Sequence, residues 1–226
     1  MNHTLVYIDP QSYHSLALYD WSLLSHVDGV EGTFIGNKQY ASPPFPACES
    51  KLWFSYSSKK TAIGKVLSYS WTLIRIAFYV LIYRPKVVHF QWLKWYPADR
   101  CLLRFLQALR IRIIYTAHNI LPHDTGLTFK KQYGQYYHMV DVIVVHSDVT
   151  KSELCNMFGE KLASKIAVIP HGLFKMDVCT QNKTEWNKKI SKLKEELGLR
   201  HQIVFGMFGL QSPYKGSDWL AQIWTE

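Results

Sequence analysis

The stretch "YTAHNILPHD" (residues 115–124) decides how the rest of the chain is interpreted. It continues an apolar run, "IRIIYTA" (111–117), whose length and composition are typical of a buried strand. Four polar side chains that can bind ligands or move protons then follow: His118, Asn119, His123 and Asp124. The sequence therefore predicts a strand that ends in a functional site.

Short apolar segments alternate with helical patterns along the first 172 residues. The expected strands are 3–9, 32–36, 86–92, 112–118, 141–147 and 165–172. The expected helices are 15–27, 61–83, 98–109, 128–140 and 147–159. This alternation predicts an α/β fold, in which a parallel sheet is covered by helices on both faces.

Polar residues gather where the expected strands end. His118, Ser147 and His171 each stand at such an end, as do the residues after Trp92. Open parallel sheets bind ligands at the carboxyl ends of their strands. We therefore expect these residues to line one edge, where the chemistry takes place.

Three local features are also predicted. Residues 37–60, with "SPPFP" at 42–46, are expected to be irregular because proline disrupts strand pairing. The helix over 128–140 is expected to be interrupted at Gly134. The next helix is expected to be capped by Ser147 or Asp148 and stopped by Gly159.

The composition changes after His171. Residues 175–200 are polar and lysine-rich with a helical pattern, and "QIVFGMFG" (202–209) then starts a new strand–helix unit. We expect a domain over 1–172, a linker and helix over 173–200, and the truncated start of a second domain over 201–226. A single strand–helix unit cannot bury its own apolar face. It is therefore expected either to be part of a longer protein or to pack on the first domain.

Composition bounds the class of protein. An apolar fraction of 48% and an aromatic fraction of 15% are typical of a globular chain with a substantial core. The scattered cysteines Cys48, Cys101, Cys155 and Cys179 form no C-x-x-C pair, which argues against a disulfide framework or a structural zinc site. They suit a reducing compartment. The start "MNHTLVYIDP" resembles the first strand of a domain, not a signal peptide.

The positive charge is regional. The chain carries a net +9, yet residues 51–112 contain 12 Lys or Arg and only one acid, Asp99, for a net +11. A basic region of this kind indicates an acidic partner, which could be nucleic acid, anionic lipid or a phosphorylated substrate. An ordinary solvated basic surface is the alternative.

Four motifs resemble the GT-B fold glycosyltransferases of the large retaining family 4, of the polysaccharide-biosynthesis type. "YTAHNILPHD" is similar to the family's T-x-H-N-x-x-P-H strand, and "VVHFQWL" to its V-V-H-x-H-W strand. "VDVIVVHSDVTKSEL" with "KIAVIPHGLF" is similar to the pair of segments that closes the N-terminal domain. "IVFGMFGLQSPYKGSDWL" resembles the strand and K-G turn that open the donor domain.

The resemblance implies two Rossmann-like domains that face each other across a cleft. The nucleotide-sugar donor, a UDP- or GDP-sugar, binds mostly to the C-terminal domain, and the acceptor binds to the N-terminal domain. Neither a cofactor nor a catalytic metal is implied. His118 matches the histidine that contacts the donor sugar and is the predicted catalytic residue. Lys215 in "PYKG" matches the lysine that binds the donor diphosphate, a role that suits an ammonium group.

Five further residues complete the predicted substrate site. Tyr13 and His14 are expected at the edge after the first strand, facing the acceptor. His123 is expected to bind the acceptor, to orient His118 or to anchor its loop. Asn119 braces the turn, and His171 with Gly172 forms a hinge between the domains.

The sequence departs from the family in several places. It lacks the arginine that many members carry after the strand glycine, here Gly209, and the glycine-rich loop after the first strand. The family's acidic E-x7-E-type region lies beyond residue 226. We therefore expect this chain to have little or no transferase activity by itself.

Residues 63–83 are long enough to cross a membrane as a helix. Arg75 stands near the middle of this segment, where a charge in lipid costs several kcal/mol, so a membrane span is disfavoured. A helix packed on the sheet or lying on an anionic membrane surface fits better. Nearby lysines and aromatic residues would suit a cytoplasmic enzyme held peripherally at the inner membrane, with a lipid-linked or polysaccharide acceptor. Ordinary core aromatics beside solvated lysines are the alternative.

Other functions remain open at this point. A metal-dependent hydrolase could use His118, His123, Asp124 and either His146 or His171, although their spacing is not H-E-x-x-H. A non-catalytic lipid- or partner-binding module is the main alternative. Nucleic-acid binding is weaker because no recognised motif accompanies the basic region. The oligomeric state is not indicated.

Overall fold

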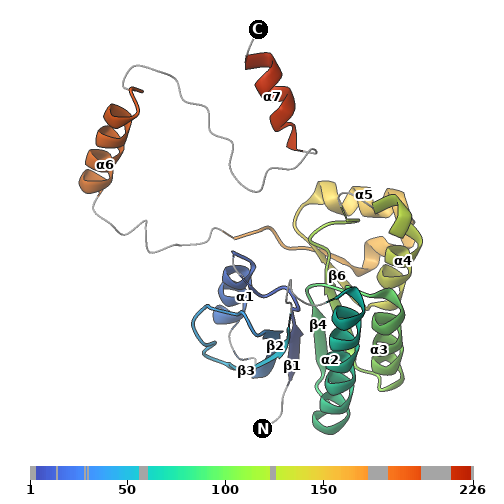
Figure 1. The fold of residues 1–226 in the computed structure, drawn as a ribbon. Helices are drawn as coiled ribbons and strands as arrows, with labels where there is room; N and C mark the ends of the chain where they lie inside the picture. The colour runs from blue at the N-terminus through green and yellow to red at the C-terminus, as the bar shows by residue number, and fades with distance from the viewer. Residues whose placement is uncertain are drawn as a thin grey trace. The chain divides into compact units, whose positions relative to one another are not determined.

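The computed structural model describes residues 4–13, 15–27, 29, 31–55, 61–122, 126–172, 183–199 and 215–224. Contacts divide the chain into two units, Met1–Phe174 and Lys175–Glu226. Each unit is described by itself (Figure 1).

A seven-stranded, fully parallel sheet forms the first unit, in the order β3-β2-β1-β4-β5-β6-β7. The strands are β1 (Leu5–Ile8), β2 (Gly32–Asn37), β3 (Cys48–Phe54), β4 (Val87–Phe90), β5 (Arg112–Thr116), β6 (Val142–Val145) and β7 (Ile166–Val168). The helices are α1 (Ser15–Ser25), α2 (Ala62–Tyr83), α3 (Tyr96–Ala108), α4 (Gly126–Met139) and α5 (Asp148–Phe158), with a 3-10 turn η1 (Glu160–Lys165).

Alternate side chains of the strands bury on opposite faces of the sheet. In β1, Val6 and Ile8 belong to the larger core, which also contains Ile76 of α2 and Leu103 of α3. Tyr7, between them, packs instead in a second apolar cluster. That cluster includes Leu24 of α1. The predicted fold class, a Rossmann-like parallel sheet with helices on both faces, is thereby confirmed (Figure 1).

The expectation that residues 37–60 are irregular is wrong for part of that range. Cys48–Phe54 forms β3, an edge strand that pairs in parallel with β2. Its residues Glu49 and Ser50 are exposed and polar, so its sequence lacks the continuous apolar run of the central strands. Edge strands of this kind are polar because they meet solvent.

The predicted interruption at Gly134 is also wrong, because α4 runs unbroken from Gly126 to Met139. Gly134 is required by packing. A Cβ at this position would lie 2.9 Å from Cδ1 of Phe158, at the end of α5. The glycine therefore lets these two helices approach closely.

The long helix predicted over 61–83 is confirmed as α2. The Thr61 side chain caps its start by accepting a hydrogen bond of 3.1 Å from the Gly64 amide. The N-cap of α5 is Ser147, one of the two expected residues, and its C-cap is Gly159, as predicted.

Two helices of the second unit are described, α6 (Lys183–Glu196) and α7 (Ser217–Trp224). α6 bears out the helical pattern expected in the linker, and ion pairs of Lys189 with Glu185 and Lys192 with Glu196 lie along it. The strand expected over 202–209 lies outside the described residues.

Candidate functional site

Three histidines converge at the carboxyl edge of the sheet, each placed there by its own strand. His118 follows β5, His146 follows β6, and His171 stands just beyond β7. The ring centroids of His146 and His171 are 3.7 Å apart, and that of His118 lies 5.3 Å from His146. We refer to these three residues as the histidine cluster. The strand-end argument correctly predicted that His118 and His171 share one edge.

Two aromatic rings contact the histidine cluster. The Trp92 ring stacks on His118, with centroids 4.8 Å apart and planes inclined by 17°. Tyr19, on α1, meets all three histidine rings edge-on at centroid distances of 5.1 to 5.9 Å. These contacts fix the orientation of His118 and remove much of its surface from water.

A hydrogen-bond network below the cluster sets the tautomer of His118. Gln91 is fully buried; its Nε2 lies 3.2 Å from Thr116 Oγ1 and 3.1 Å from His89 Nε2. Because the amide nitrogen faces these acceptors, its Oε1 faces His118 Nε2 at 2.8 Å. His118 Nε2 must then carry the proton and donate it to Gln91. Its Nδ1 is left with a free lone pair.

Burial keeps the His118 imidazole neutral. Desolvation, and next the neighbouring His146 and His171, together lower the pKa of His118 to about 3. Desolvation likewise lowers the pKa of His89 to about 3. Both rings are therefore neutral at physiological pH and act through hydrogen bonds rather than charge.

A pair of buried carboxyl groups lies at the same edge, next to the end of β1. Asp9 follows β1 and Asp20 lies on α1, and the two side chains are 2% and 0% exposed. Burial raises the pKa of Asp9 to about 6. Burial, and next the charge of Asp9, raise the pKa of Asp20 well above its usual value. Tyr7 donates a hydrogen bond of 2.8 Å to Asp20 Oδ1.

Lys94 brings an amine to the same end of the sheet. Its Nζ lies 4.9 Å from the centroid of the Trp92 ring. Burial lowers its pKa to about 8, while the charges of Asp9 and Asp99 oppose that change.

Of the other predicted site residues, some lie in the first unit, one lies in the second, and two fall outside the described residues. Tyr13 is half-buried in the turn after β1, and its amide donates to the Gln11 carbonyl. Asn119 is half-buried directly after His118. Lys215 lies in the second unit, just before α7, and is described only within that unit. His14 and His123 lie outside the described residues.

The sequence did not single out Gln91, Trp92 or Tyr19 as site residues. Gln91 and Trp92 follow β4, so the strand-end rule that found His118 also points to them. Tyr19 gives no such signal, because it reaches the edge from the middle of a helix.

A second region of the first unit is unusual because apolar side chains are exposed there. Along α2, one solvent-facing stripe consists of Ile63, Leu67, Trp71, Ile74, Phe78 and Ile82, whose exposed fractions range from 46% to 73%. We call these six residues the α2 stripe. The opposite side of α2 is buried in the core through residues such as Ile76 and Val80. The helix is thus apolar on both sides, and by length and composition it could cross a membrane.

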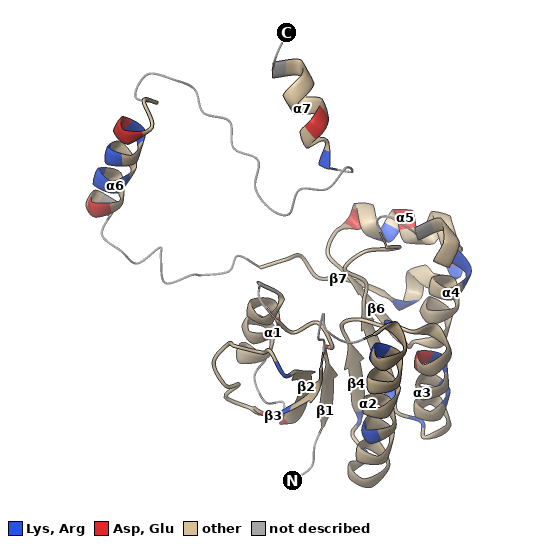
Figure 2. Ribbon diagram, in the orientation of Figure 1, with Lys and Arg blue, Asp and Glu red and all other residues tan. Residues whose placement is uncertain are grey.

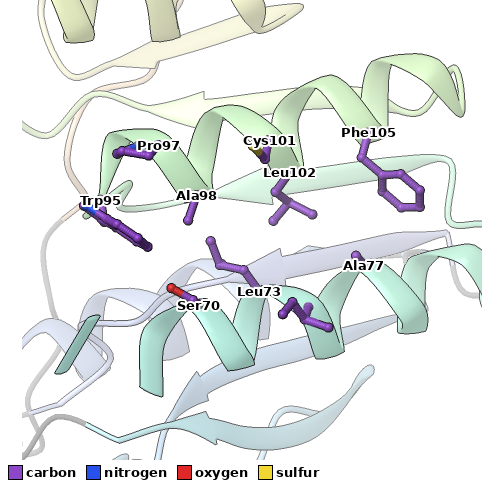
Figure 3. Close-up of a pocket in the computed structure, with 10 residues that line it drawn as sticks. Ser70, Leu73, Ala77, Trp95, Pro97, Ala98, Cys101, Leu102 and Phe105 are labelled. Atoms are coloured by element: carbon purple, nitrogen blue, oxygen red, sulfur yellow. The ribbon is translucent and has the colours of Figure 1, made fainter. Parts of the chain in front are cut away.

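An apolar groove of about 480 Å³ lies between α2 and α3 (Figure 3). Ser70, Leu73 and Ala77 line it from α2, and Trp95 and Phe105 lie towards its two ends. Trp95 stands at the start of α3, three residues after Trp92. The groove therefore begins near the edge that carries the histidine cluster.

Basic side chains surround this apolar region. Arg104 on α3 and Arg75 on α2 are exposed, and the Arg75 guanidinium lies 4.3 Å from the centroid of the Trp53 ring. Lys and Arg residues occur along both helices, and Asp99 is their only acid (Figure 2). Asp99 is buried, where it accepts hydrogen bonds from Tyr69 and Tyr136. The exposed charge of α2 and α3 is therefore positive.

Two solved structures share the fold. The chain aligns with the crystal structure of a glycosyltransferase from Rickettsia africae ESF-5 at a TM-score of 0.52 and 16% identity, covering 88% of this chain and 50% of that one. It also aligns with a sucrose-phosphate synthase structure from Thermosynechococcus elongatus at a TM-score of 0.50 and 13% identity, covering 86% of this chain and 98% of that one. The chain thus spans about half the length of the Rickettsia structure.

No curated protein matches the chain significantly. The family profile of Glycosyltransferase Family 4 matches residues 42–173, which is more than half of the chain. This range runs from before β3 to beyond His171 and includes His118, His146 and Gln91. The chain therefore belongs to glycosyltransferase family 4.

Proposed function

We propose that the chain is the acceptor-side half of a two-domain GT-B glycosyltransferase. The enzyme transfers a sugar from a UDP- or GDP-sugar to a lipid-linked or polysaccharide acceptor, with retention of configuration and without a catalytic metal. The observation that carries the proposal is the fixed, neutral His118 at the carboxyl edge of the sheet, hydrogen-bonded to Gln91 and stacked on Trp92.

His118 acts by position. Its Nε2 proton is committed to Gln91, so its Nδ1 lone pair can accept a hydrogen bond from a hydroxyl of the bound sugar. Holding reactants in a productive geometry can supply about 7–11 kcal/mol of the barrier in favourable cases. The Gln91 and Trp92 contacts limit the motion of the ring, which is what a positioning role requires.

The remaining residues are assigned by their place along the chain. Tyr13, His14 and His123 contact the acceptor, Asn119 braces the turn after His118, and His171 lies at the hinge. Lys215, in the second unit, binds the donor diphosphate through its ammonium group. Because the donor site depends on a complete second domain, the chain alone has little or no transferase activity.

The α2 stripe and the groove support the proposal that this enzyme acts at a membrane surface. Aromatic and aliphatic side chains with basic neighbours bind at the boundary of anionic lipid headgroups. One side of α2 belongs to the protein core through Leu73, Ile76 and Val80, and Arg75 is exposed near its centre, so the helix lies on the surface instead of crossing it. The enzyme is then a peripheral protein of the cytoplasmic face of the inner membrane.

Membrane binding also favours a lipid-linked acceptor. The α2–α3 groove opens beside Trp95, close to the edge that carries Trp92 and His118. A lipid chain held along the groove would present its head group at that edge.

The second candidate function is a non-catalytic module that binds lipid or a partner protein. It is favoured by the exposed α2 stripe, and it gives no role to the hydrogen-bonded His118. Nucleotide-sugar binding therefore separates the two functions.

Calorimetry tests the proposal. A panel of UDP- and GDP-sugars is titrated into the chain alone and into the chain continued through a complete donor-binding domain. Binding by the longer protein, with weak or no binding by the chain alone, supports the glycosyltransferase. Failure of both proteins to bind any nucleotide-sugar overturns it in favour of the binding module.

A further inference from the structure

We propose that His118, His146 and His171 form a binding site for a divalent metal ion of the zinc type. Each offers one ring nitrogen, and the three nitrogens lie within 4.8 Å of one another. The set contains imidazoles and no carboxylate, a composition that suits zinc, copper or nickel rather than magnesium or manganese. Such a site is additional to the proposed transfer reaction, which uses no metal.

Hydrogen bonds leave one unprotonated ring nitrogen on two of the three imidazoles. His118 Nε2 donates to Gln91 Oε1 at 2.8 Å, which leaves Nδ1 with its lone pair. His146 Nδ1 lies 2.9 Å from the Ile169 carbonyl oxygen and must donate to it, which leaves Nε2 with its lone pair. Metal-bound histidines almost always donate their second ring nitrogen to an oxygen in this way.

The free nitrogen of His146 is unusual. Its Nε2 is buried and has no hydrogen-bond partner among the described residues. A buried acceptor without a partner loses the hydrogen bonds it would make in water, which destabilises the folded protein. A bound metal ion would satisfy this atom.

Movement of the His171 side chain can bring the three nitrogens to the spacing that zinc requires. Zinc–nitrogen bonds of about 2.0–2.1 Å in a tetrahedral site place ligand nitrogens about 3.4 Å apart. The three ligand nitrogens now lie within 4.8 Å of one another. To bind zinc, each pair must therefore come closer by about 1.4 Å or less. His171 is exposed, so its side chain can change rotamer at little cost. The fourth coordination position is left for water.

A bound ion would inhibit transfer. It would occupy Nδ1 of His118, the atom that the proposed function assigns to the sugar. Competition between zinc and the nucleotide-sugar rests on that function, whereas metal binding itself does not. The binding experiment below therefore separates failure of the metal site from failure of the transferase.

Metal binding is measured on the chain itself, without a polyhistidine tag and after chelator treatment. Zn²⁺ is titrated by calorimetry, and Co²⁺ is added as a spectroscopic probe whose visible absorption reports tetrahedral nitrogen ligation. We expect one ion per chain and a tetrahedral Co²⁺ spectrum. We expect His171→Ala to weaken zinc binding by at least roughly 10–100-fold, since loss of even an outer partner costs that much.

Matched variants make the result specific. His171 is exposed, so His171→Ala leaves folding intact, and His146→Gln tests the buried ligand with folding checked by circular dichroism. His138→Ala removes an exposed histidine on α4 and should bind zinc as the wild type does. The proposal is overturned if the wild type binds no zinc, or if His171→Ala binds it as tightly as the wild type.

Discussion

The carboxyl edge and the α2 stripe depart in opposite ways from the usual burial of apolar side chains and exposure of polar ones. At the edge, polar groups such as Gln91 and Asp20 are fully buried. On the stripe, apolar groups such as Trp71 and Ile82 are more than 60% exposed. Both arrangements are costly in an isolated domain, and such local violations are expected at functional sites. Both violations support the proposed chemistry at the edge and the proposed contact of the stripe with a membrane.

The largest effect is expected from His118→Ala, made in the chain continued through its donor-binding domain. Transfer should fall by at least roughly 100-fold, because a misplaced sugar loses the advantage of fixed orientation. The measurement is the transfer rate from the donor found by calorimetry. Circular dichroism must show an unchanged fold. A variant that is folded and as active as the wild type would remove His118 from the mechanism.

The α2 stripe is tested by Trp71→Glu combined with Phe78→Glu. Each aromatic side chain gives about 1.5–3 kcal/mol when fully buried, so the double variant should bind anionic vesicles roughly 100-fold or more weakly. Vesicle co-sedimentation measures the change. Leu127→Glu is the matched control, because Leu127 is 82% exposed on α4, away from the stripe. Equal losses in the two proteins would contradict the assigned surface.

The buried carboxyl pair predicts a pH dependence of stability at the edge. The pKa of Asp9 is about 6 in the folded protein and about 3.9 in an unfolded chain, so folding favours its protonated form. The contribution of Asp9 to the unfolding free energy should therefore be greatest below about pH 4 and fall by about 3 kcal/mol as the pH rises to about 6. Asp20, whose pKa is also raised, extends the fall in the contribution of the carboxyl pair to higher pH.

Asp9→Asn tests that dependence, since the amide stays neutral. Its stability relative to the wild type should improve by about 3 kcal/mol between pH 4 and pH 6.5. Urea unfolding, followed by tryptophan fluorescence at several pH values, gives the difference. A difference that does not change with pH would show that burial does not raise the pKa of Asp9.

The smallest effect concerns the charges beside the stripe. A basic residue near an anionic surface contributes about 1 kcal/mol, so Arg104→Gln should weaken vesicle binding roughly fivefold at low salt. The effect should disappear at high salt, where the charges are screened. Lys131→Gln, on α4, is the matched control. An effect that persists in salt would mean that Arg104 acts through packing and not through charge.

The sequence predicts which residues end the strands, but not which side chains surround His118. Buried parallel strands are recognisable in the sequence as apolar runs. The polar residues that follow these runs lie at one edge of the sheet, and this rule predicts the positions of His118 and His171. The sequence could not reveal that Tyr19 covers them, because that contact depends on how α1 packs. Nor could it show that Gln91 fixes the tautomer of His118.

The two errors in the fold have a shared cause. The sequence does not reveal β3, because this strand lies at the edge of the sheet and carries exposed polar residues. The sequence predicts a helix break at Gly134, because it does not show that this glycine packs against Phe158, a residue of another helix. Both depend on tertiary contacts, which local composition does not contain.

One measurement tests most directly the claim that these two regions serve one reaction. The protein, continued through its donor-binding domain, is incubated with radiolabelled UDP- or GDP-sugars and membranes of its source cells, and label is counted in the extracted lipid. We predict incorporation by the wild type and Leu127→Glu, none by His118→Ala, and much less by the Trp71→Glu, Phe78→Glu variant. Absence of labelled lipid with every donor, or equal incorporation by His118→Ala, would contradict the account.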